Sequence, residues 1–76
     1  MTKYLSQSAL GQYFGIYGNK LRKLQAVLRK EGAILNDQKT GIIYFEYDAV
    51  IQNTKPIKYI PEHIFLIHNQ YQEQLN

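Results

Sequence analysis

The sequence contains no cysteine and no tryptophan, and only one methionine and two prolines. Without cysteine, the fold cannot depend on a disulfide or a thiolate zinc site, which often stabilise very small domains. The longest apolar run, residues 64–67, is far shorter than the roughly 20 residues of a membrane span, and the N-terminus lacks a charged-then-apolar signal pattern. We therefore expect a cytoplasmic protein.

Residue sets that would carry catalysis or hold a metal are also missing. No Ser/His/Asp combination is in view, and the carboxylates are scattered, so no nucleophile and base can be named. His63 and His68 are five residues apart and would not share a helix face, and residues 36–41 lack the alternating ligands of a calcium loop. We expect no enzyme activity, no cofactor and no metal.

The composition of the chain is typical of a folded protein, with 45% hydrophobic residues, seven tyrosines and three phenylalanines. At 76 residues it can fill one core only, so residues 1–76 should form a single domain. Its charge is unevenly distributed. Residues 1–30 hold six Lys or Arg and no Asp or Glu, whereas residues 31–54 hold four acids and one lysine. This asymmetry is typical of a protein with one face turned toward a polyanion.

Two helices are predicted in the basic half of the chain. Ser6 can cap a first helix that ends at Gly15, with Leu5 and Leu10 packed together as a hydrophobic staple. After a short connection, a second helix should run over residues 19–31 and end at Gly32. This second helix has two unlike faces. Leu21, Leu24 and Leu28 share one side, while the other side carries Asn19, Lys23, Ala26 and Lys30, flanked by Lys20, Arg22 and Arg29.

The second half of the chain predicts a β-hairpin, with strands over 33–35 and 42–47 and a turn over 36–41. A short strand is also expected at residues 2–5. Asp48 either caps a short helix over residues 49–51 or these residues extend the strand. Residues 53–57 should form a loop, and Pro61 should open a last helix with a stripe of Ile64, Ile67, Tyr71 and Leu75. The fold class is thus α+β.

Residues 7–26 resemble the helix-turn-helix signature. Gln7 opens it, Leu10-Gly11 stands where a Leu-Ala pair is usual, and Phe14-Gly15-Ile16 stands where Leu-Gly-Ile is usual. Leu21 and Leu24 hold the two apolar positions of the second helix. The chain departs from the pattern at Tyr17, where a Ser or Thr cap is usual.

With the hairpin added, the chain is similar to small winged helix-turn-helix proteins of phages and plasmids, including excisionase-like and antirepressor-associated domains. The resemblance implies a sequence-specific double-stranded DNA-binding protein, a small transcriptional regulator with helix 19–31 in the major groove and the 36–41 wing on the backbone. Base contacts are expected from Asn19, Lys23 and Tyr17, and phosphate contacts from Lys20, Arg22, Arg29, Lys30 and Lys39.

Other interpretations stay open. A winged-helix scaffold encoded by a phage or plasmid could instead bind or inhibit a host protein. The tyrosines at 44, 47, 59 and 71 could form a stacking platform for single-stranded nucleic acid, although core packing or dimer contact explains them more simply. A homodimer is expected because one recognition helix reads only a half-site, and the C-terminal helix is its expected interface.

Overall fold

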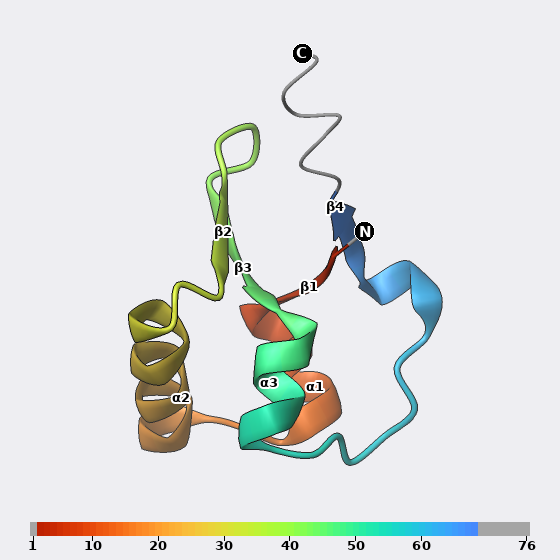
Figure 1. Cartoon of the computed structure of the whole chain (residues 1–76). Coiled ribbons are helices and arrows are strands. Elements are labelled where there is room, and N and C mark those ends of the chain that lie inside the picture. The colour runs from red at the N-terminus through yellow and green to blue at the C-terminus, as the bar shows by residue number, and fades with distance from the viewer. Residues whose placement is uncertain (1, 69–76) are drawn as a thin grey trace.

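Residues 2–68, the part of the chain that the computed structural model describes, form short helices and strands (Figure 1). Three α-helices and four strands lie within that range, together with one turn of 3₁₀-helix. In chain order they are β1 (Thr2–Ser6), α1 (Gln7–Phe14), α2 (Gly18–Lys30), β2 (Ile34–Asp37), β3 (Ile42–Glu46), α3 (Tyr47–Asn53), η1 (Glu62–Ile64) and β4 (Leu66–His68). The expected α+β class is confirmed.

The four strands form one antiparallel sheet in the order β2-β3-β1-β4. A row of apolar residues crosses three of them, because Phe45 of β3 pairs with Leu5 of β1 on one side and with Ile34 of β2 on the other. Leu5 and Phe45 are almost completely buried, at 0% and 1% exposed. They belong to the same apolar cluster as Leu10 of α1, Leu28 of α2 and Val50 of α3. The core therefore lies between this face of the sheet and the three helices.

The predicted ends of α1 are confirmed. The Ser6 hydroxyl accepts a hydrogen bond from the backbone N–H of Ala9 at 3.3 Å, as an N-cap does. Gly15 follows the helix with φ of 66°, a left-handed conformation that glycine adopts without a steric penalty, and its N–H donates to the Gly11 carbonyl. Leu5 and Leu10, the predicted staple, are both fully buried in the core cluster.

The open choice at Asp48 is decided in favour of a helix. β3 ends at Glu46, one residue earlier than predicted, and residues 47–53 form α3. Asp48 lies in the first turn and is not the cap, since Glu46 takes the N-cap position without a side-chain hydrogen bond. Helical spacing lets Ala49 and Val50 bury together in the core. In a strand, successive side chains point to opposite faces of the sheet, so one of the two would face away from the core.

The prediction of a C-terminal helix that begins at Pro61 is wrong within the described residues. Residues 62–64 form a single 3₁₀ turn, and residues 66–68 form strand β4 along the outer edge of β1. The physical reason is that β1 otherwise has unpaired backbone groups at that edge, and the run Phe65-Leu66-Ile67 suits an extended strand. Ile64 and Ile67 therefore do not share a helical stripe, and Tyr71 and Leu75 lie outside the described residues.

Candidate nucleic-acid interface

Helix α2 lies at the edge of the molecule, beside α3 and below the β2–β3 hairpin in Figure 1. It begins at Gly18 and ends at Lys30, one residue earlier at each end than predicted. Only two of its side chains are buried, Leu24 and Leu28, at 8% and 0% exposed, and Leu21 is half-buried. The predicted apolar side is therefore the side that anchors α2 to the core.

The opposite side of α2 is open to solvent. Its exposed polar side chains are those predicted from the helical spacing: Asn19, Lys20, Arg22, Lys23, Arg29 and Lys30. The helix itself contains no Asp or Glu. Within residues 2–68 the sole ion pair joins Lys3 to Glu62, elsewhere in the fold, so the five cations of α2 have no carboxylate partner there. Their charge is available to an external anion.

Tyr17 has a different role from the others. It occupies the N-cap position of α2 with extended backbone, but its side chain makes no capping hydrogen bond. Its ring lies against Gly11 of α1, yet the side chain remains 66% exposed. Part of this ring thus packs between the two helices while the rest faces solvent. The expected departure from the usual capped second helix is confirmed.

Lys39 lies at the tip of the β2–β3 hairpin, away from the other predicted residues in sequence and on a different element. The tip is organised by Asp37, whose Oδ1 accepts the Lys39 backbone N–H at 3.1 Å and whose Oδ2 accepts the Thr40 hydroxyl at 3.0 Å. Thr40 Oγ1 accepts in turn from the N–H of Ile42. This role of Asp37 is not among the sequence-based predictions, although an Asp followed by Thr-Gly three residues later is a turn signal.

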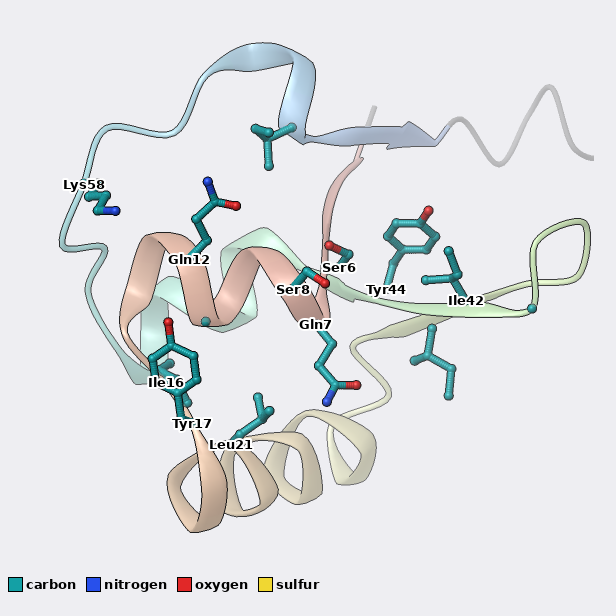
Figure 2. A pocket seen from close by; sticks show the side chains of 14 residues that line it. Ser6, Gln7, Ser8, Gln12, Ile16, Tyr17, Leu21, Ile42, Tyr44 and Lys58 are labelled. Atoms are coloured by element: carbon teal, nitrogen blue, oxygen red, sulfur yellow. The ribbon is translucent and has the colours of Figure 1, made fainter.

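A hollow of about 1080 Å³ lies over the outward side of α1 (Figure 2). Figure 2 shows Tyr17 and Tyr44 near opposite ends of α1, with Ser8 and Gln12 projecting from the helix between them. The hollow is lined by Ser6, Gln7, Ser8, Gly11, Gln12, Ile16, Tyr17, Leu21, Gly41, Ile42, Ile43, Tyr44, Lys58 and Ile64. Sequence reasoning missed it because these residues come from three separate stretches of the chain that only the fold brings together.

Comparisons with models of protein families, with curated proteins and with solved structures find no match for this chain. In the part of the chain that the structure describes, no three His, Asp or Glu residues are grouped as a metal site would require. Nor does any helix in residues 2–68 have the length and hydropathy needed to cross a membrane. Function must therefore be inferred from the exposed charges and the shape of the molecule.

Proposed function

We propose that this protein is a small winged helix-turn-helix regulator that binds double-stranded DNA through α2. The observation that carries the proposal is the outward side of α2, where five exposed cations stand without an acidic partner in residues 2–68. The major groove is about 12 Å wide and admits an α-helix. With 13 residues, α2 is about 20 Å long, so it could lie in the groove along much of its length.

The arrangement around α2 supports the same proposal. A three-residue connection joins α1 to α2, and the β2–β3 hairpin follows directly, with β1 paired to β3. This order of strand, two helices and hairpin is the order expected of a winged helix-turn-helix domain. In the proposal, α1 and the core hold α2 in a fixed orientation while the hairpin supplies a second contact to the backbone of the duplex.

Separate roles are proposed for the predicted contact residues. Asn19 and Lys23 lie in the first half of α2, the part of a recognition helix that reaches deepest, so they are assigned to base edges. Lys20, Arg22, Arg29, Lys30 and the tip residue Lys39 are assigned to phosphates, which position a protein without reading sequence. Tyr17 is assigned a contact through the exposed part of its ring.

The test is a fluorescence anisotropy titration with labelled duplex DNA at several salt concentrations. About five phosphate contacts per protein copy predict a log–log slope of affinity against salt of about −4 to −5. A pool of random duplexes carried through rounds of selection provides the specific site. We expect salt-dependent binding to all duplexes and tighter binding to the selected one. Absence of salt-dependent binding to any duplex would contradict the proposal.

Substitutions at two lysines of α2 distinguish base recognition from phosphate contact. Lys30→Ala should weaken binding to selected and random duplexes alike and reduce the salt slope by about 1. Lys23→Ala should reduce the preference for the selected site, by about 1–3 kcal/mol if it contacts a base. The matched control is Lys55→Ala, an exposed lysine in the loop after α3, which should change neither. Equal losses for Lys55→Ala and Lys30→Ala would show attraction by net charge only.

A homodimer remains a prediction, since nothing in residues 2–68 tests it. If two copies bind one site, selection should return an inverted repeat whose half-sites are about 10 base pairs apart, or a multiple of that spacing. Sedimentation of the protein–DNA complex then gives the number of copies directly.

A further inference from the structure

A second, smaller hollow lies on the side of the molecule away from α2. It is formed by the start of α3, the loop after α3, β1 and the residues around η1. Figure 1 shows this loop and η1 on the other side of α1 and α3 from α2. Its volume is about 280 Å³. Ligand pockets for whole small molecules are about 300–1,000 Å³, so this hollow suits a single side chain better than a cofactor.

Aromatic rings form the walls of this hollow. Tyr47 and Phe65 meet edge to face, with ring centroids 4.9 Å apart and planes at 75°. The Lys3 ammonium lies beside this wall, 5.0 Å from the centre of the Phe65 ring and 3.1 Å from the Glu62 carboxylate. Tyr59 and its neighbours Pro56, Lys58 and Ile60 also line the hollow. The result is a small hollow lined by three aromatic side chains.

The loop after α3 exposes two large apolar side chains, of which Tyr59 lines the hollow and Ile57 does not. Tyr59 is 83% exposed, and Ile57 in the same loop is 65% exposed. The backbone beneath them is nevertheless fixed, since the N–H of Ile57 donates to the carbonyl of Tyr13 at 2.7 Å and Ile60 is buried in the core. Exposed tyrosine and aliphatic side chains on a fixed backbone are typical of residues that anchor protein–protein contacts.

The charge beside the hollow favours a ligand that carries negative charge. The lining holds three charged residues, Lys3, Lys58 and Glu62. Glu62 is paired with Lys3, which leaves the exposed Lys58 without a carboxylate partner in residues 2–68. A ligand that places an apolar side chain between the rings thus finds uncompensated positive charge beside it. A cationic ligand, such as the quaternary ammonium groups that aromatic cages bind, would be repelled.

We propose that this hollow binds an acidic peptide segment of a partner protein, with one apolar side chain of the segment between Tyr47, Tyr59 and Phe65, and a carboxylate against Lys58. The site is separate from α2, so a bound duplex leaves it free. The hollow has room for about one side chain, so a peptide suits it better than a run of stacked bases. The proposal does not depend on DNA binding.

The test is selection from a library of random short peptides displayed on phage, with the full chain immobilised. We expect the enriched peptides to combine acidic with apolar residues. A synthetic copy of one enriched peptide, labelled with a fluorophore, is then titrated against variants. Tyr59→Ala and Lys58→Glu should each reduce its affinity at least about tenfold, the size expected when an anchoring contact is lost.

Controls on α2 distinguish this site from general charge attraction. Lys30→Glu makes the same charge change as Lys58→Glu, and Val27→Ala removes an exposed apolar side chain from α2, so neither should weaken peptide binding. Because Tyr59 and Lys58 are exposed, their variants should keep the circular dichroism of the parent. Three results would overturn the proposal: no enrichment of acidic peptides, equal loss with Lys30→Glu, or a Tyr59→Ala variant that loses affinity for a single-stranded oligonucleotide and not for the peptide.

Discussion

The ring of Tyr17 lies so close to Gly11 that a Cβ atom at residue 11 would be 2.8 Å from Cε1 of the ring. Even alanine, the residue usual at this position of the helix-turn-helix pattern, would therefore displace the ring. The space that Gly11 leaves is filled by the ring of the tyrosine that precedes α2.

This contact predicts coupling between Gly11→Ala and Tyr17→Ala. Alanine is better than glycine inside a helix by up to about 1 kcal/mol, but in the parent this gain is offset by the displaced ring. With Tyr17→Ala already in place, Gly11→Ala should raise the free energy of unfolding by about 0.5–1 kcal/mol. Urea unfolding of the four proteins measures the coupling. Strictly additive effects would mean that ring and helix do not touch.

Leu28→Ala tests whether α2 is anchored as the burial indicates. Leu28 is 0% exposed, so its truncation should lower the free energy of unfolding by about 2–5 kcal/mol, a large part of the stability of so small a domain. Val27→Ala, next to it and 39% exposed, should have an effect below about 1 kcal/mol. Both are measured by denaturant unfolding. Similar losses for the two variants would contradict the assigned orientation of α2.

Asp37→Ala tests the order of the hairpin tip. The substitution removes the acceptors of the Lys39 N–H and the Thr40 hydroxyl, which are both exposed, so the change in unfolding free energy should be no more than about 1 kcal/mol. Hydrogen exchange at the Lys39 amide should become faster, because that N–H loses its partner. Asp48→Ala, which removes the same charge from α3, should leave the Lys39 exchange rate unchanged.

The ion pair between Lys3 and Glu62 should contribute little to stability. Their side chains are 41% and 73% exposed, so water and salt screen the attraction. Glu62→Gln should therefore change the free energy of unfolding by less than about 0.5 kcal/mol. Lys3→Gln also removes the ammonium over the Phe65 ring and should have the larger effect, up to about 1 kcal/mol. Thermal unfolding at low and high salt compares them, and a larger loss from Glu62→Gln would be unexpected.

Local interactions made much of the fold predictable from the sequence. The ends of α1 follow from Ser6 and Gly15, because a cap depends only on residues within one helical turn. The two sides of α2 follow from the spacing of its leucines and cations, since helical geometry alone assigns them to opposite faces. The candidate site is predictable for the same reason, because all its cations except Lys39 are neighbours on one helix.

Only the tertiary structure decided the elements whose conformation depends on distant partners. Residues 47–53 become a helix because Ala49 and Val50 bury together in the core, and residues 66–68 become a strand because β1 has a free edge. Periodicity over so few residues suits either conformation, so the available surface makes the choice. The two hollows likewise join segments far apart in the sequence, and their shape follows from packing, which no local pattern records.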